Sequence, residues 1–317
     1  MDMQQNAFWT HYLCIKHDSK HNFLTVLRFV IEFTKNIGIF DMYEEFYGLK
    51  EKPFSIQPDP DFLFFGHRHG MAYAMLEYGI ANRAGFIVIC GEIGCGKTTL
   101  VRHLLNNIDS DIKVGIVYNT HQNIDDMLGW IMLAFGQSYE GLSELALYDA
   151  FQNFLISSYA SGQRVVLIID EAQNLSPGAL ESLRMLSNIN ADKDQLLQII
   201  LVGQPQLRDL LRRPDMQQFI QRVAVDYFIP PLPALEVAKY ITHRLSRAGR
   251  EKSLFTIRAI ERIAEASKGI PRSINILCDM VLVYGFSSGA EKIGIDLVNE
   301  VLRDREEFGV LAYTNDQ

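Results

Sequence analysis

The sequence GEIGCGKTTL occupies residues 91–100 and decides the fold class. It follows an apolar run at 85–90 (GFIVIC) and precedes a segment with helical spacing at 101–105 (VRHLL). The pattern G-x-x-x-x-G-K-[ST] between a strand and a helix predicts a phosphate-binding P-loop. Glycine lets backbone N–H groups approach a phosphate closely, and the following helix presents its positive end to the same group.

We expect this loop to bind ATP through consecutive residues. They are Gly91, Glu92, Ile93, Gly94, Cys95, Gly96, Lys97, Thr98 and Thr99. Lys97 would place a positive charge on the β- and γ-phosphates, and Thr98 would supply a hydroxyl ligand for Mg²⁺. A glycine-rich turn without a ligand is the alternative, and the flanking strand and helix patterns count against it.

A second segment carries two adjacent carboxylates. Residues 164–169 (RVVLII) form an apolar run, and Asp170 and Glu171 follow directly. Such a run is typical of a central parallel strand, which delivers acidic side chains to its carboxyl end. We expect Asp170 to complete the Mg²⁺ shell and Glu171 to orient the attacking water or accept its proton. Together with the P-loop, the segment predicts ATP hydrolysis; alone, it could be a strand that ends in a solvated acidic turn.

The composition is that of an ordinary globular protein. The chain has 317 residues, which suggests roughly two domains, and a formal net charge of −8. That charge argues against binding nucleic acid by bulk electrostatics, although a local basic patch is compatible with it. The cysteines lack metal-ligand spacing and predict reduced cytosolic thiols. They are Cys14, Cys90, Cys95 and Cys278. We find neither an apolar run of 18 residues nor a secretion signal in the sequence.

Helical and strand patterns alternate in the first two thirds of the chain and are purely helical after that. The predicted strands are 85–90, 114–118, 164–169 and 196–202. A predicted helix at 69–83 precedes the first strand, and predicted helices at 97–107, 123–135, 142–161 and 178–188 lie between the strands. This alternation predicts an α/β fold, a parallel sheet with helices on both faces. Helical spacing then recurs at 235–249, 256–268, 271–286 and 294–304. It predicts a small all-helical lid domain.

We therefore expect four parts of the chain. An α/β ATPase domain spans 42–230, a helical lid 231–310, and a tail 311–317. Residues 1–41 form an N-terminal extension, with an amphipathic pattern at 23–33 that is too charged to span a bilayer and could be a docking helix. We expect the natural start at Met42, because a tyrosine-rich and then proline-punctuated segment follows it.

A P-loop α/β domain followed by a helical lid resembles the AAA+ ATPases. In that family a polar residue at the end of the fourth strand acts as the first sensor, and the resemblance assigns this role to Gln204. The family's arginine finger, which reaches the ATP of a neighbouring subunit, falls on Arg222, with Arg212 or Arg213 as alternatives. The second sensor falls on Arg272 of the GIPRSIN segment, where proline opens a helix.

Further motifs resemble the general secretion pathway protein A type of AAA+ ATPase, in particular the version associated with exosortase, PEP-CTERM and exopolysaccharide loci. They are Tyr43–Leu49, Pro53-Phe54, Pro58–Pro60, His69, Tyr78-Gly79, the P-loop, Asp170–Leu175, Leu183–Asn188 and Gly203–Pro205. The resemblance implies ATP and Mg²⁺ as cofactors, a homo-oligomeric ring or filament, and secretion or polysaccharide export machinery at the inner membrane as partner. It also implies a cytoplasmic location. In the relatives the segment before the first helix borders the adenine, which here corresponds to residues 64–69. Within this segment, His69 is more simply interpreted as a helix cap or a packing residue. The alternative function is a DNA-associated regulator of the transposition or replication type, which shares this architecture.

Overall fold

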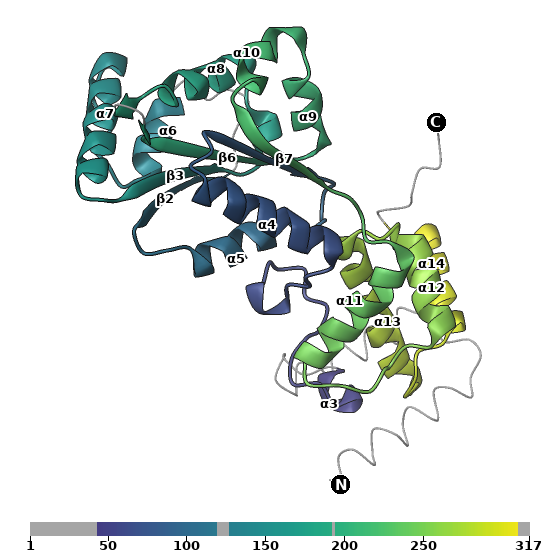
Figure 1. Cartoon of the computed structure of the whole chain (residues 1–317). Coiled ribbons are helices and arrows are strands. Elements are labelled where there is room, and N and C mark those ends of the chain that lie inside the picture. The colour runs from purple at the N-terminus through teal and green to yellow at the C-terminus, as the bar shows by residue number, and fades with distance from the viewer. Residues whose placement is uncertain (1–42, 119–126, 192–193, 310–317) are drawn as a thin grey trace.

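The structure is a computed structural model that describes residues 43–118, 127–191 and 194–309. Figure 1 shows an α/β layer at one end of the molecule and a bundle of helices at the other. The predicted fold class is confirmed: a parallel sheet with helices on both faces precedes a helical region. The expected extension at 1–41 and tail at 311–317 lie outside the described residues, as does the expected start at Met42.

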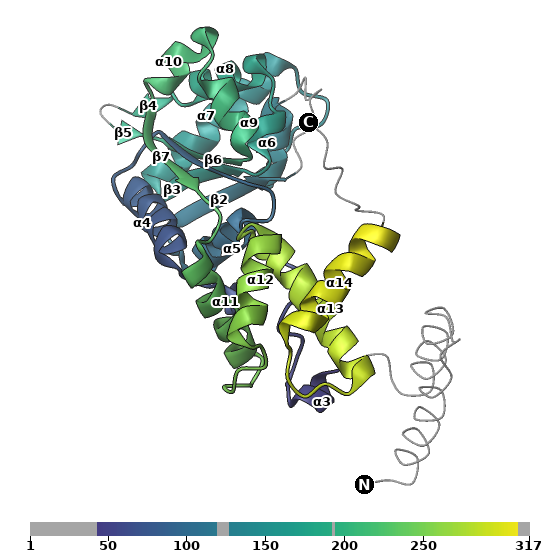
Figure 2. The same cartoon turned by 90° about the vertical axis from the view of Figure 1, so that its right-hand side faces the viewer.

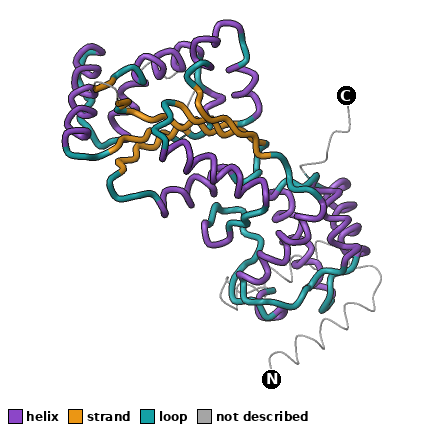
Figure 3. Tube along the Cα trace, in the orientation of Figure 1, coloured by secondary structure: helices purple, strands orange, loops and turns teal. Residues whose placement is uncertain are grey.

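In the described residues the main sheet has five parallel strands, ordered β2-β3-β6-β1-β7. Their bounds are β1 Phe86–Gly91, β2 Ile112–Val117, β3 Arg164–Ile169, β6 Leu197–Gly203 and β7 Val223–Ile229. Every residue of β1 and β6 is buried, as expected of central strands that helices cover on both faces (Figure 3). Because β1, β3 and β6 are adjacent and parallel, the P-loop, the two acids and Gln204 lie together at the carboxyl ends of these strands. We call this side of the sheet the sheet edge.

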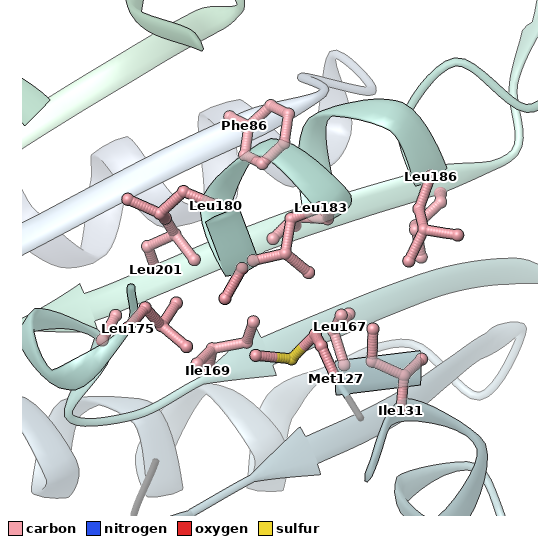
Figure 4. Close-up of a cluster of buried hydrophobic side chains, with 14 of the residues drawn as sticks. Phe86, Met127, Ile131, Leu167, Ile169, Leu175, Leu180, Leu183, Leu186 and Leu201 are labelled. Atoms are coloured by element: carbon pink, nitrogen blue, oxygen red, sulfur yellow. The ribbon is translucent and has the colours of Figure 1, made fainter. Parts of the chain in front are cut away.

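Alternate residues of each strand face two separate cores. The α/β layer contains the helices α4 His67–Ala81, α5 Lys97–Asn107, α6 Met127–Ala134, α7 Glu144–Ala160, α8 Pro177–Leu186, α9 Pro205–Leu211 and α10 Gln217–Ile220. Phe86, Leu167 and Leu201 pack with α6 and α8, as Figure 4 shows. Ile87, Ile168 and the other alternate residues pack with α4 and α5 on the opposite face. This period-2 alternation holds the strand ends in place from both sides.

The structure differs from the sequence prediction in a few elements. Strand β7 was not predicted; it pairs with β1 and is the outermost strand on that side of the sheet. The predicted helix 123–135 is α6 in the described residues, and its first part lies outside them. The remaining short elements are the β4–β5 hairpin (Asn190–Ala191 and Asp194–Gln195) and the 3-10 turns η1 Pro60–Phe62, η2 Ala172–Asn174 and η3 Pro214–Met216.

The helical region consists of the predicted elements. They are α11 Ala234–Arg247, α12 Ile257–Ser267, α13 Pro271–Ser288 and α14 Ile295–Phe308. Thr256 caps α12 by accepting a hydrogen bond from the Ala259 N–H, and Gly289 ends α13 in the left-handed conformation. None of the helices in the described ranges is both long and apolar enough to cross a bilayer.

The segment 43–64, which precedes the α/β layer in sequence, packs on the helical region. It contains the short helix α3 (Glu44–Tyr47), which lies beside the helical bundle in both views (Figures 1 and 2). Its buried aromatic side chains join the core of α11–α14; they are Tyr43, Tyr47, Phe54 and Phe62. We call residues 53–64 the strap, because they run between the helical region and α5.

Candidate nucleotide site

The P-loop joins β1 to α5 with two glycines in the left-handed region. Gly94 has a φ of +81° and Gly96 a φ of +95°, which L side chains rarely adopt. A Cβ on Gly94 would also lie 2.5 Å from Cβ of Arg272. The loop therefore needs glycine for its own backbone and for the approach of the helical region.

Lys97 begins α5 and is buried. Its Nζ donates hydrogen bonds to the carbonyl oxygens of Gly91 at 2.8 Å and Glu92 at 3.0 Å. The ammonium group thus lies inside the curve of the loop, where a phosphate would meet the backbone N–H groups. Cys95 is fully buried in the same loop, and burial raises the pKa of its thiol, so it stays protonated as a packing residue.

Thr98 and Asp170 form an oxygen pair. Thr98 Oγ1 donates to Asp170 Oδ2 at 3.1 Å, and Asp170 Oδ1 accepts from the Glu171 N–H at 2.9 Å. Burial is the largest influence on Asp170 and raises the pKa of its carboxyl group. Hydroxyl and carboxylate oxygens suit Mg²⁺, which in nucleotide sites takes its other ligands from phosphates and water. In the part of the chain that the structure describes, no cluster of three His, Cys, Asp or Glu side chains could hold a metal ion. The Thr98 and Asp170 oxygens fit Mg²⁺ by their own chemistry.

Glu171 lies in a small network of side-chain amides. Its backbone has a φ of +55°, which is uncommon for a non-glycine residue. Its Oε2 accepts from Gln173 Nε2 at 2.6 Å and from Gln204 Nε2 at 2.8 Å, and Gln173 Oε1 accepts from the Gln204 N–H at 2.9 Å. Gln173 was not singled out from the sequence, although it lies within the Asp170–Leu175 motif.

A cavity of about 200 Å³ lies between three parts of the molecule. Residues 93–99, Glu171 and Gln204 line it from the sheet edge, and the strap lines it from the side. Residues from α11 and α13 line it from the helical region; they are Tyr240, Arg244, Pro271, Arg272 and Asn275. His69 and Leu232 line it as well. The strap is fastened there, because Arg244 donates from Nη2 to the Ser55 carbonyl at 3.0 Å and Asn275 donates to the same oxygen at 3.2 Å.

Two contacts join neighbouring elements to the P-loop backbone. The Arg272 N–H at the start of α13 donates to the Gly94 carbonyl at 3.1 Å. His69, in the first turn of α4, lies 2.7 Å through Nε2 from the Cys95 carbonyl. Burial lowers the pKa of His69, so its ring is neutral near pH 7 and Nε2 carries the donated proton. His69 is buried against the loop, in keeping with a packing role.

Arg222 lies apart from the cavity. It directly precedes β7, where Val223 pairs with Phe86 and Ile229 pairs with Gly91. At about 3.3 Å per residue, the length of β7 separates Arg222 from the P-loop end of the sheet by roughly 20 Å. Of the two alternatives, Arg213 forms an ion pair with Asp215 at 2.8 Å. Among the sequence-predicted site residues the sheet edge thus gathers the P-loop, Asp170, Glu171, Gln204 and Arg272, but not Arg222.

The fold and the cavity define a nucleotide-binding P-loop domain, and comparison with known families agrees. Residues 80–211 match the model of the AAA domain family. This range runs from the end of α4 to the end of α9 and includes β1, the P-loop, both acids and Gln204.

The chain is also similar over most of its length to a secretion pathway protein. It is 40% identical over 253 residues to general secretion pathway protein A of Aeromonas hydrophila, and the match covers 80% of this chain and 46% of the relative. The chain thus spans about half the length of the curated relative that it matches. It carries an AAA domain and is related over most of its length to general secretion pathway protein A.

Solved structures support the fold alone. The Aeropyrum pernix ORC2 protein, in ADPNP–ADP complexes, aligns with a TM-score of 0.57 and 18% identity over 78% of this chain and 72% of its own. The Aeropyrum pernix ORC1 protein in complex with DNA aligns with a TM-score of 0.58 and 18% identity over 80% and 70%. At this identity the likeness confirms the AAA+ architecture and carries no functional detail.

Proposed function

We propose that the protein binds ATP together with Mg²⁺ in the cavity between sheet edge and helical region, and hydrolyses it. One observation carries the proposal. A buried lysine, a hydroxyl–carboxylate pair, a held glutamate and a lid arginine come together at one cavity from three separate stretches of the chain, 97–98, 170–171 and the start of α13. Phosphoryl transfer needs mainly positioned charge, and this is the set of charges that it needs.

Each residue has a defined task in this proposal. The loop N–H groups and Lys97 bind the phosphates. Thr98 and Asp170 would hold Mg²⁺, which would supply positive charge against the phosphates. Glu171 orients the attacking water and accepts its proton. Gln204 contacts the γ-phosphate from the end of β6. Arg272 contacts it from the start of α13, where positive charge favours the departing phosphoryl group.

We also propose the arrangement that the site requires. The chain comprises an AAA+ domain at 42–230 and a helical lid at 231–310, with the strap packed on the lid, and segments 1–41 and 311–317 outside these two domains. Arg222 completes the site of a neighbouring subunit in a homo-oligomeric ring or filament. Its distance from the P-loop of its own subunit supports a role in trans.

The proposed task is to drive assembly or remodelling of a secretion or exopolysaccharide export system from the cytoplasmic side of the inner membrane. The 40% identity to general secretion pathway protein A supports the secretion part, and the motif resemblance supports the exosortase and PEP-CTERM association. The net charge of −8 disfavours the alternative task on DNA.

Two substitutions test the proposed chemistry. We expect Lys97→Ala to abolish binding of a fluorescent ATP analogue, because it removes the charge that meets the ground-state phosphates. We expect Glu171→Gln to keep binding and lose phosphate release, because Glu171 acts when water attacks. The exposed Lys239→Ala and Glu140→Gln serve as matched controls with wild-type values. Unchanged phosphate release by Glu171→Gln would contradict the assignment.

The cellular task needs a separate experiment. We expect a deletion strain to lose secreted protein or exopolysaccharide, and the wild-type gene but not Glu171→Gln to restore it. Full secretion in the deletion strain, with an altered rate of transposition or replication, would favour the DNA-associated alternative instead.

A further inference from the structure

We propose that Gln173 is a positioning residue that makes the orientation of Glu171 depend on Gln204. The inference rests on the proposed function, because it concerns the residue assigned to water activation. Gln173 does not line the cavity; it acts through the two residues that do.

The geometry is a closed ring of three hydrogen bonds. Gln173 donates to Glu171 Oε2 at 2.6 Å and accepts from the Gln204 N–H at 2.9 Å, while the Gln204 side chain donates to the same Oε2 at 2.8 Å. Glu171 follows β3 and Gln204 follows β6, which are neighbouring strands. One amide side chain therefore spans the ends of both strands and uses its donor on one and its acceptor on the other.

The surrounding packing holds Gln173 in this place. Its turn, η2, begins at the fully buried Ala172 and packs against α9, which starts directly after Gln204. Gly203 leaves room for the amide, because a Cβ there would lie 3.1 Å from Gln173 Oε1 and 2.8 Å from Cδ2 of Leu207. A side chain packed in this way has few alternative rotamers, so its bond direction is set before nucleotide arrives.

The ring has a chemical consequence for Glu171. Two amide donors on Oε2 fix the rotation of the carboxylate plane, and that rotation sets where the second oxygen, Oε1, points. A shift of Gln204 toward a γ-phosphate would move its backbone N–H and its side chain together, and both bonds of Gln173 would change with it. Water would then be activated only when the first sensor is in its nucleotide-bound position.

The test compares two replacements of Gln173 in the full chain. Gln173→Met keeps the length of the side chain and removes both hydrogen bonds. Gln173→Glu keeps an acceptor for the Gln204 N–H and places a second carboxylate against Glu171. The exposed Gln206→Met, two residues after Gln204 at the start of α9, is the matched control.

We expect both Gln173 variants to lower kcat for ATP hydrolysis about 10- to 100-fold, as for loss of one hydrogen bond to a charged group, with KM within about twofold of wild type. In the Glu171→Gln background we expect Gln173→Met to change the residual turnover by less than about twofold, since a positioning residue acts only through its target. The thermal midpoint and the affinity for an ATP analogue, measured in parallel, detect a merely structural effect.

Each outcome of this test supports or overturns the inference. Gln173→Met with more than about half of wild-type kcat overturns the inference and leaves the proposed function intact. An equal fractional loss of turnover in the wild-type and Glu171→Gln backgrounds also overturns it, because Gln173 would then act independently of Glu171. If wild-type protein fails to hydrolyse ATP, or if Glu171→Gln hydrolyses it normally, the proposed function fails and the inference fails with it. Should Gln173→Met not fold, Gln173→Glu answers the same question.

Discussion

Gly94 offers a direct test of how the helical region meets the P-loop. Its φ of +81° is strained for any L side chain, and a Cβ there would lie 2.5 Å from Cβ of Arg272 and 3.2 Å from its Cδ. The Arg272 Cβ is attached to the backbone at the start of α13 and cannot rotate away. Gly94→Ala must therefore push the first turn of α13 off the loop.

The loss of stability expected in Gly94→Ala can be estimated by comparison with a control glycine, Gly136. Gly136 has a φ of +66° with open space around it, so Gly136→Ala adds only the left-handed backbone cost of about 1–2 kcal/mol. Gly94→Ala adds the same cost and also loses the hydrogen bond from the Arg272 N–H to the Gly94 carbonyl, about 1 kcal/mol more. At about 2–4 °C per kcal/mol, the scale for 150–250 residues, the thermal midpoint should fall by a few degrees further in Gly94→Ala.

Nucleotide affinity separates the two variants more sharply. If Arg272 meets the γ-phosphate from its present position, its displacement should weaken binding of ATP about tenfold, which corresponds to about 1.4 kcal/mol. Gly136→Ala, which lies in the loop after α6, should bind as the wild type does. We would measure thermal denaturation and titrate a fluorescent ATP analogue against both variants and the wild type. Equal midpoints for the two variants, together with wild-type affinity in Gly94→Ala, would refute the packing argument.

Three further predictions follow from the site. Burial raises the pKa of Asp170, so the ionised carboxylate lowers the stability of the nucleotide-free protein at neutral pH. Asp170→Asn should therefore raise the thermal midpoint without nucleotide and abolish the stabilisation by ATP with Mg²⁺, both measured by differential scanning fluorimetry. Burial lowers the pKa of His69, so the unfolded chain binds the proton at higher pH than the folded protein, and the free energy of unfolding falls as the pH drops below about 6.5. In chemical denaturation, His69→Gln should reduce this fall, whereas the control His67→Gln, at an exposed position, should leave it unchanged. Inactive Arg222→Ala and Lys97→Ala subunits should regain turnover when mixed, because an arginine supplied in trans adds about 10³-fold or more; co-assembly without activity would point to Arg212 or Arg213.

Residues that share a contiguous motif could be placed from the sequence. The P-loop and the Asp170-Glu171 pair each follow a largely apolar, buried strand, and parallel strands of one sheet have their carboxyl ends on the same side. Helices α11–α14 could be predicted because each has an apolar stripe with helical spacing and a recognisable start, such as Pro271. In these cases the local pattern and the tertiary structure require the same residues, so local reasoning succeeds.

Strand β7 was missed because its pattern is that of an edge strand. Ala224 and Asp226 are exposed, and Val225 and Ile229 are its buried positions, so it has neither the apolar run of β1 nor a regular alternation over its whole length. It is followed at once by the proline-rich junction at 230–233, which resembles a linker. The pairing of β7 with β1, from Val223 opposite Phe86 to Ile229 opposite Gly91, shows that the segment belongs to the sheet.

The cavity was half predictable for a related reason. The lining residues at the strand ends could be predicted, because the sheet determines their position. The lining residues of the strap and of the helical region depend on contacts between segments that are far apart in sequence, which no local pattern predicts. Arg244 donates to the carbonyls of Pro53 and Ser55, which lie 191 and 189 residues earlier in the sequence, and its guanidinium lies 4.6 Å from the centre of the Phe62 ring. An isolated arginine in an amphipathic helix is normally solvated, and a proline-punctuated strap is normally a linker. Arg244 is buried because the strap carbonyls lack partners within a helix or strand and a guanidinium can satisfy two of them at once. The walls of the cavity are therefore set by backbone groups that need hydrogen-bond donors, a requirement that becomes visible only once the strap and α11 lie side by side.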